Sequence, residues 1–108
     1  MTHFLIAEVK VTDDAWVPDY AAAVHDIAAK HGGRYLARSG KLTAMEGPAK
    51  DLTLIALIQF PDEASLRAFA DDPTYAPYAK ARQDGSESHF TMIDDSDIAG
   101  AIPYLPKG

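Results

Sequence analysis

Three polar side chains in predicted β-strands are the residues of this sequence best suited to acid–base chemistry. Glu8 and His89 belong to the first and last predicted strands, and Gln59 lies near the end of a central apolar run. We expect all three to face the same side of one sheet and to lie near one another. A carboxylate among apolar side chains has a raised pKa and can act as a base, with an imidazole passing the proton on. The alternative is that Glu8 pairs with a neighbouring Lys or Arg and that His89 is an exposed strand residue.

Two other charged groups are candidates for binding a ligand. Arg34 and Arg38 belong to one predicted strand, and we expect them to share a face and to fork onto a ligand carboxylate. The alternative is an edge strand that is protected from aggregation by its charge. Glu46 precedes the Gly47-Pro48 turn, where it could bind the ligand, cap the loop or pair with Arg38.

Composition excludes several kinds of chemistry. The sequence has no cysteine, which removes disulfides, thiolate catalysis and cysteine metal sites. His25 and His31 are six residues apart and do not share a helical face, so we expect no metal site and no cofactor. The net charge of −6 argues against nucleic-acid or anionic-membrane partners. The N-terminal stretch lacks the pattern of a signal peptide, so we expect a cytoplasmic protein.

The predicted sheet depends on the apolar stretch 51–61, which reads D-L-T-L-I-A-L-I-Q-F-P. Its bulky and β-branched residues indicate a strand that is buried on both faces. One face carries Leu54, Ala56, Ile58 and Phe60, and the other carries Ile55 and Leu57. The remaining predicted elements are strands over 3–11, 34–38 and 88–94, an extended segment over 41–46, helices from the T-D-D start at 12–14 to 31 and over 62–71, and a turn or helix over 75–83.

The element order βαββαβ predicts an α+β protein with the ferredoxin-like plait. We expect a four-stranded antiparallel sheet with two helices on one face and with strands one and three in the centre. The predicted domain spans 1–94, and 95–108 form a C-terminal tail. Because both faces of the central strand are apolar, we expect a homodimer whose sheets pack on one another, with the tail packing on the partner subunit.

An ordered set of short motifs resembles a known family. These motifs are T-D-D at 12–14, Tyr20, H-G-G-R-Y-L-A-R-S-G at 31–40, M-E-G at 45–47, F-P-D at 60–62, and D-P-T-Y at 72–75 with Arg82. The chain resembles the DUF 1330 family, a domain of unknown function in the dimeric α+β-barrel (ferredoxin-like) superfamily, up to about residue 94. The resemblance implies a ferredoxin-like protomer and a homodimer. The wider group includes cofactor-independent monooxygenases, muconolactone-isomerase-like enzymes, and haem- or ligand-binding members.

The resemblance also identifies candidate site residues. Tyr20, Tyr75 and Arg82 occupy positions that belong to the family's motifs, and they either line a pocket or pack the helices. The sequence therefore predicts a small homodimer with a small-molecule pocket. The protein is either a cofactor-independent enzyme (oxygenase- or isomerase-like) that acts on a small, partly apolar substrate, or a non-catalytic ligand-binding or structural dimer. The residues expected to bind the ligand are Tyr20, Arg38, Glu46, Gln59, Tyr75 and Arg82, with Glu8 and His89 as the candidates for catalysis.

Overall fold

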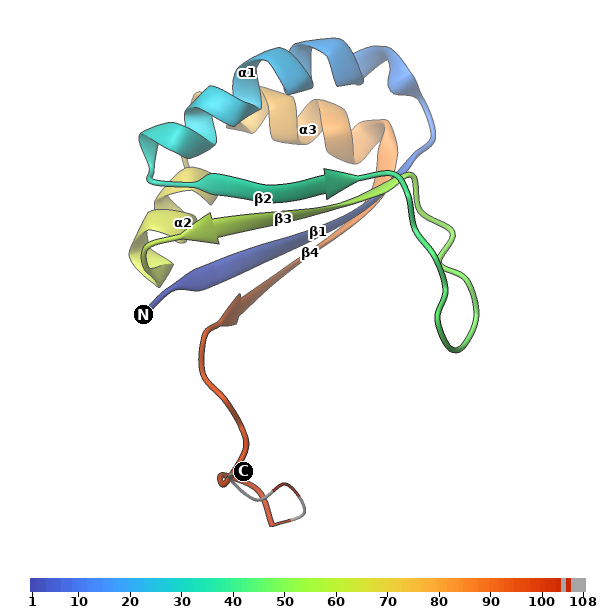
Figure 1. Ribbon diagram of the computed structural model, residues 1–108. Coiled ribbons are helices and arrows are strands. Elements are labelled where there is room, and N and C mark those ends of the chain that lie inside the picture. Colours follow the sequence, from blue (N-terminus) through green and yellow to red (C-terminus); the bar gives the residue numbers. More distant parts are fainter. Residues whose placement is uncertain (104, 106–108) are drawn as a thin grey trace.

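The structure, a computed structural model, describes residues 1–103 and residue 105. Its strands form one antiparallel sheet in the order β2-β3-β1-β4, and the helices cover one face of it (Figure 1). This confirms the predicted ferredoxin-like fold with the first and third strands in the centre. The elements are β1 (His3–Val11), the short 3-10 helix η1 (Asp14–Trp16), α1 (Val17–Lys30), β2 (Arg34–Ser39), β3 (Leu54–Phe60), α2 (Glu63–Ala70), α3 (Ala76–Asp84) and β4 (Ser86–Asp94).

The helical layer differs from the prediction in one respect. The prediction has two helices on the sheet, whereas the segment expected to be a turn or a helix adds a third one, α3. Pro73 separates it from α2, because a proline disfavours the helical conformation in the residue before it. A second proline, Pro77, lies in the first turn of α3, where its missing N–H does least harm.

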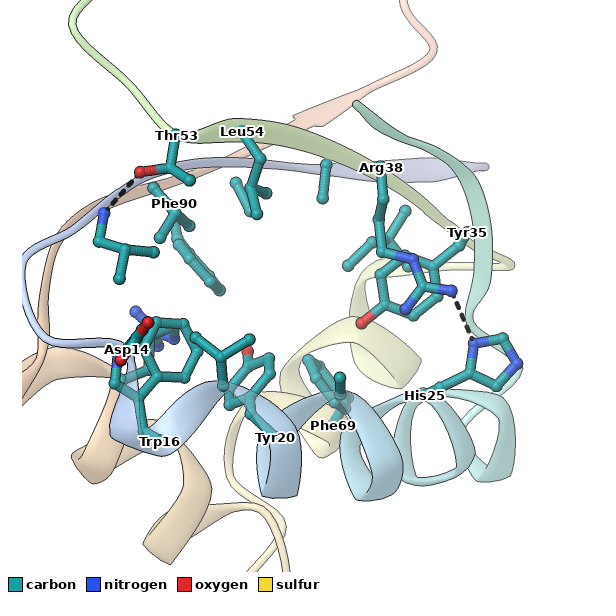
Figure 2. Close-up of a pocket in the computed structure, with 18 residues that line it drawn as sticks. Asp14, Trp16, Tyr20, His25, Tyr35, Arg38, Thr53, Leu54, Phe69 and Phe90 are labelled. Atoms are coloured by element: carbon teal, nitrogen blue, oxygen red, sulfur yellow. Dashed lines mark hydrogen bonds between the residues drawn. The ribbon is translucent and has the colours of Figure 1, made fainter. Parts of the chain in front are cut away.

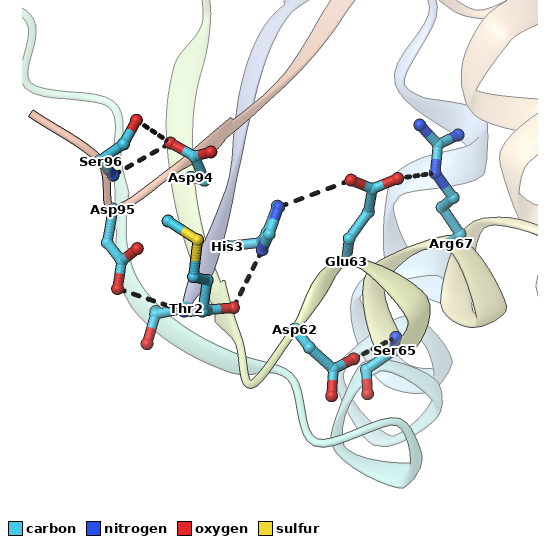
Figure 3. A network of polar contacts seen from close by, with 10 residues as sticks. Thr2, His3, Asp62, Glu63, Ser65, Arg67, Asp94, Asp95 and Ser96 are labelled. Atoms are coloured by element: carbon cyan, nitrogen blue, oxygen red, sulfur yellow. Dashed lines mark hydrogen bonds and ion pairs between the residues drawn. The ribbon is translucent and has the colours of Figure 1, made fainter. Parts of the chain in front are cut away.

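Polar caps fix where η1 and α2 begin. The Asp13 side chain accepts a hydrogen bond from the Ala15 amide at the start of η1. The Asp62 carboxylate accepts one from the Ser65 amide at the start of α2, at a distance of 2.7 Å (Figure 3). Each cap satisfies an N–H group that has no partner within its helix.

The hydrophobic core lies between the sheet and the helices. Aromatic rings dominate its centre: Phe69 packs 5.5 Å from Phe60 and 4.4 Å from Tyr75, measured between ring centroids. Burial of a large apolar side chain contributes about 1.5–3 kcal/mol, so these rings hold α2 and the start of α3 to the sheet. The buried members of this core are Leu5, Val24, Ala28, Ile58, Phe60, Leu66, Phe69 and Tyr75.

The helices leave the opposite face of the sheet uncovered (Figure 1), and apolar side chains lie on that face. Leu57 is 38% exposed and Ile93 is 47% exposed. Ile6 lies directly across from Leu57 in the β1–β3 ladder, and Phe4 lies across from Ile93 in the β1–β4 ladder. We call this surface, made of Phe4, Ile6, Ile55, Leu57 and Ile93, the open face.

Strand β2 contains an irregularity that changes the direction of its side chains. Arg34 pairs with Gln59, whereas Arg38 pairs with Ala56, and the register shifts between Tyr35 and Ala37. An extra residue in a strand reverses the alternation of faces beyond it. The expectation that Arg34 and Arg38 share a face is therefore wrong: Arg34 points to the open face and Arg38 to the side of the helices.

Two segments extend away from the compact body (Figure 1). Residues 40–53 form a long loop that includes the predicted extended segment 41–46, and an ion pair of 2.7 Å between Lys10 and Asp51 anchors its return. The tail leaves β4 beside the N-terminus, where the Asp95 amide donates to the Thr2 carbonyl. The Asp95 carboxylate also accepts a hydrogen bond from the Thr2 amide (Figure 3). Packing of the tail on a partner stays a prediction, and residues 104 and 106–108 of that tail lie outside the described residues.

None of the helices in the described part of the chain has the length and hydrophobicity needed to cross a membrane.

Candidate small-molecule site

A cavity of about 540 Å³ lies between α1 and the helix-covered face of the sheet (Figure 2). Its floor contains Ala7 of β1 and Ala56 of β3, which lie directly across from each other in the two central strands. These two small side chains leave space under α1 that larger residues would fill. Apolar residues make up most of the wall, namely Ala7, Val9, Val11, Val17, Ala21, Leu54, Ala56, Ile58, Phe69 and Phe90.

One end of the cavity carries a stack of three side chains. The bulge in β2 turns Arg38 toward α1, and its guanidinium lies 4.0 Å above the centre of the Tyr35 ring. His25 of α1 stacks on the same tyrosine at 5.4 Å, with ring planes only 10° apart. Arg38 Nη2 lies 3.4 Å from His25 Nδ1 (Figure 2). Arg38 is exposed, so this stack forms a polar rim.

Tyr20 lies deeper, on the face of α1 that looks toward the sheet. Its hydroxyl is 3.0 Å from the hydroxyl of Tyr75, and its ring meets that of Trp16 edge to face at 5.1 Å. Burial raises the pKa of Tyr20 well above its ordinary value of 10.0, and the neighbouring Tyr75 raises it further. The hydroxyl of Tyr20 is therefore a neutral donor or acceptor at physiological pH.

Trp16 is held in the wall by Gly85 at the end of α3. The indole Nε1 donates to the Gly85 carbonyl at 3.1 Å. A Cβ atom at position 85 would clash with Trp16 Cδ1, so this close approach requires glycine.

Arg82, in the last turn of α3, is only 5% exposed. Its guanidinium lies 4.0 Å above the centre of the Phe90 ring and 6.0 Å from that of Tyr20. Its Nε has no hydrogen-bond partner among residues 1–103 and 105. The cavity therefore borders a buried cation with an unused donor.

The other buried charged side chain lies outside the cavity and is fully engaged. The Asp72 carboxylate lies 2.7 Å from His31 Nε2 and 2.9 Å from Lys30 Nζ, and it accepts hydrogen bonds from Thr74. These contacts, that of His31 first, hold the pKa of Asp72 well below its usual range. The cluster joins the end of α1 to the α2–α3 turn, which is a structural role.

The structure brings together about half of the residues that the sequence suggested for binding. Tyr20, Arg38 and Arg82 line the cavity, and Tyr75 is bonded to Tyr20 from the core. Glu46 lies in the exposed loop and lines a separate hollow, of about 540 Å³, with Ile55.

The residues proposed for acid–base chemistry lie on the open face and not in the cavity. Glu8 pairs in register with His89, as expected, and makes an ion pair of 3.2 Å with Lys50. Gln59 lies across from Phe4, four positions along β1 from Glu8, which corresponds to about 13 Å. The expectation that Gln59 lies near Glu8 is wrong, because antiparallel pairing sends the end of β3 toward the start of β1.

Sequence reasoning missed several residues of the cavity wall, chiefly Asp14, Trp16, His25, Tyr35 and Phe90. One available signal was the occurrence of alanine at buried positions of both central strands. Ala7 and Ala56 interrupt rows of larger apolar residues on the face that points toward α1.

The model of the family described as "Domain of unknown function (DUF1330)" matches residues 2–96. The chain belongs to the DUF1330 family. No curated protein sequence gives a significant match to this DUF1330 protein.

Solved structures with a similar fold are distant in sequence. A protein of unknown function from Rhodopseudomonas palustris has a TM-score of 0.74 and 14% identity over 89% of this chain and 83% of its own. SnoaB, a cofactor-independent oxygenase from Streptomyces nogalater, has a TM-score of 0.62 and 16% identity over 89% of this chain and 94% of its own. A protein from Bacteroides thetaiotaomicron described as a possible oxidoreductase has a TM-score of 0.55 and 16% identity over 86% and 96%. These similarities establish the ferredoxin-like fold.

Proposed function

We propose that this DUF1330 protein binds a small, partly apolar molecule in the cavity under α1 and acts on it without a cofactor. The observation that carries the proposal is the form of the cavity: apolar walls with a few polar groups that converge on it. Its volume of about 540 Å³ lies within the range of small-molecule sites. Tyr20, Arg38 and Arg82 are among these polar groups, and they come from three different elements.

The polar groups suit a reaction in which the substrate gains negative charge. Removal of a proton from the carbon next to a carbonyl, or from the hydroxyl of a phenol, produces such an anion, with the Asp14 carboxylate or the His25 imidazole of the cavity wall as the proton acceptor. Both isomerisation and cofactor-free oxygenation by O2 can begin in this way. Arg82 would stabilise the anion electrostatically in a site whose walls are mostly apolar. Either hydroxyl of the Tyr20–Tyr75 pair can donate in their mutual hydrogen bond, and when Tyr75 donates, the Tyr20 O–H is available to a ligand oxygen. The shared fold with the oxygenase SnoaB is consistent with this class of reaction.

A second candidate is non-catalytic ligand binding. It is favoured by the position of Glu8 and His89, which lie on the opposite face of the sheet from the cavity. Asp14 and His25, which do line the cavity, are both exposed at its edge. Incubation of the protein with any ligand that co-purifies with it distinguishes catalysis from simple binding. A ligand that stays unchanged after prolonged incubation in air and in anaerobic buffer would favour simple binding.

We further propose that the protein forms a homodimer through the open face. Leu57 and Ile93 would lose their contact with water in such an interface, which contributes about 25 cal/mol per Å² of apolar surface. A two-fold dimer buries the same surface on both subunits and so covers both open faces at once.

Two adjacent alanines of α1 allow a matched test of the binding site. Both alanines are exposed, but Ala21 lines the cavity and Ala22 does not. Phenylnaphthylamine, a neutral apolar dye that fluoresces on leaving water, serves as the probe. We expect Ala21→Phe to weaken dye binding by about tenfold because the new ring fills the cavity, and Ala22→Phe to leave it unchanged. Equal binding to both variants would place the dye elsewhere and contradict the proposal.

A further inference from the structure

Arg82 differs from every other charged side chain in the described part of the chain. Only Asp72 and Arg82 are buried charged residues there, with 6% and 5% exposure. Asp72 has His31, Lys30 and Thr74 as partners. None of the ion pairs between described residues involves Arg82, and its Nε–H is unbonded. A buried charge without a counter-charge is costly, and such charges are normally paired.

The surroundings of Arg82 explain its orientation but do not satisfy its donors. Its position in the last turn of α3 places a positive charge at the negative end of the helix dipole. The face of the Phe90 ring, 4.0 Å away, attracts the guanidinium through a cation–π contact. Neither interaction accepts a hydrogen bond in the plane of the guanidinium. The one carboxylate lining the same cavity, that of Asp14, forms no ion pair with Arg82 among the described contacts.

We propose that Arg82 is the anion-recognition residue of the cavity, and that the natural ligand is an organic acid with an apolar, ring-sized body. The inference rests on the proposed binding function and specifies the chemical class of the ligand. The carboxylate, or an equivalent anionic oxygen, accepts from the guanidinium, which suits planar oxyanions better than an ammonium does. The body of the ligand lies over Ala7 and Ala56, between the aromatic side chains of Trp16 and Phe90.

The charge distribution supports an anionic ligand. The whole protein carries a net charge of −6, which by itself would repel anions. The cavity wall departs from this balance, because Arg38 and Arg82 line it with Asp14 as its single carboxylate. Tyr20, whose ring centre lies 6.0 Å from the Arg82 guanidinium, adds a neutral hydroxyl to the same wall.

The test uses two dyes that share the same ring system. Anilinonaphthalene sulfonate carries an anionic group, and phenylnaphthylamine is the same body without it. We expect Arg82→Met to weaken binding of the sulfonate by about 10- to 100-fold, because a charge-assisted hydrogen bond is lost. Binding of the neutral dye should change by less than about threefold, because that dye has no anionic group. Arg67→Met is the matched control: Arg67 is exposed on α2 and does not line the cavity, so we expect its loss to change sulfonate binding by less than about threefold.

The outcomes separate the two proposals. If Arg82→Met binds the sulfonate as tightly as the wild-type protein does while the neutral dye still binds, the anion assignment is wrong and the binding site stands. If the wild-type protein binds neither dye, the proposed binding function itself fails.

A second measurement needs no variant and so does not depend on how Arg82→Met folds. Naphthoate and naphthamide, which differ in charge but hardly in shape, compete with phenylnaphthylamine for the wild-type protein. We expect naphthoate to displace the dye at a concentration at least about tenfold lower. Equal displacement by the two competitors would overturn the assignment of an anionic ligand.

Discussion

The hydroxyl oxygens of Tyr20 and Tyr75 lie 3.0 Å apart, and this hydrogen bond connects the wall of the cavity to the hydrophobic core. Tyr75 is 4% exposed and packs on Phe69, whereas Tyr20 faces the cavity. The position of the Tyr20 hydroxyl in the binding site is thus fixed by a residue more than fifty positions away in the sequence. This contact, together with Arg82, gives the cavity a defined polar corner.

Replacing Tyr75 by phenylalanine should test that connection. The ring stays in the core while the hydrogen bond is lost, so we expect the free energy of unfolding to fall by about 1 kcal/mol. Urea denaturation followed by circular dichroism measures this change. Tyr78→Phe is the control, since the described residues give its hydroxyl no hydrogen bond and its loss should change stability less. Equal effects of the two substitutions would show that the bond to Tyr20 contributes little.

Alkaline pH should destabilise the protein through Tyr20. Burial raises the pKa of this hydroxyl above its ordinary value of 10.0, so the unfolded chain loses the proton before the folded chain does. The stabilisation is complete below pH 10 and is lost progressively as the pH rises further. Denaturation midpoints measured across this range should fall with pH, and the fall should be smaller in Tyr20→Phe. An identical pH dependence in that variant would contradict the assignment.

Acid should destabilise the protein through Asp72. Its pKa is lowered in the folded state by His31, Lys30 and Thr74, so its contribution is present above the ordinary value of 3.8 and is lost as the pH falls below that value. We expect Asp72→Asn to lower the thermal midpoint at neutral pH and the difference from the wild type to narrow in acid. Asp71→Asn, at the exposed neighbouring position, is the matched control. A difference that stays constant with pH would show that the lost shape of the side chain, and not its charge, is responsible.

A lysine on the open face should separate the proposed dimer. Leu57 lies at the centre of that face, across from Ile6, and a charge there would remain uncompensated between two sheets. We expect Leu57→Lys to be a folded monomer by light scattering at micromolar concentration. Ala29→Lys, on the exposed side of α1, should leave the oligomeric state unchanged. A wild-type protein that is itself a monomer would remove the proposal.

Much of the fold could be predicted because it depends on local patterns. The alternation in β1, the continuous apolar run in β3 and the caps at Asp13 and Asp62 each indicate their element from neighbouring residues alone. The order of the strands follows from the handedness of their connections.

The candidate site was harder to predict because it depends on pairing between distant segments. The bulge in β2 carries no glycine or proline signal, and yet it decides that Arg38 faces α1. The void under α1 arises from two alanines, Ala7 and Ala56, that meet only after β1 and β3 have paired. The predicted acid–base residues therefore lie on the open face, whereas the cavity lies on the other face of the sheet, where two small residues leave space.

The most direct test of the proposed binding site under α1 is to map where an apolar ligand binds. The chemical shifts of the backbone amides and of the Trp16 indole N–H should be recorded while phenylnaphthylamine is titrated into protein uniformly labelled with ¹⁵N. We predict that the largest changes occur at the Trp16 indole and at the amides of Tyr20, Ala21 and Ala56, which surround the cavity. Changes concentrated at Glu8, Leu57 and His89 would place the ligand on the open face of the sheet and contradict the account.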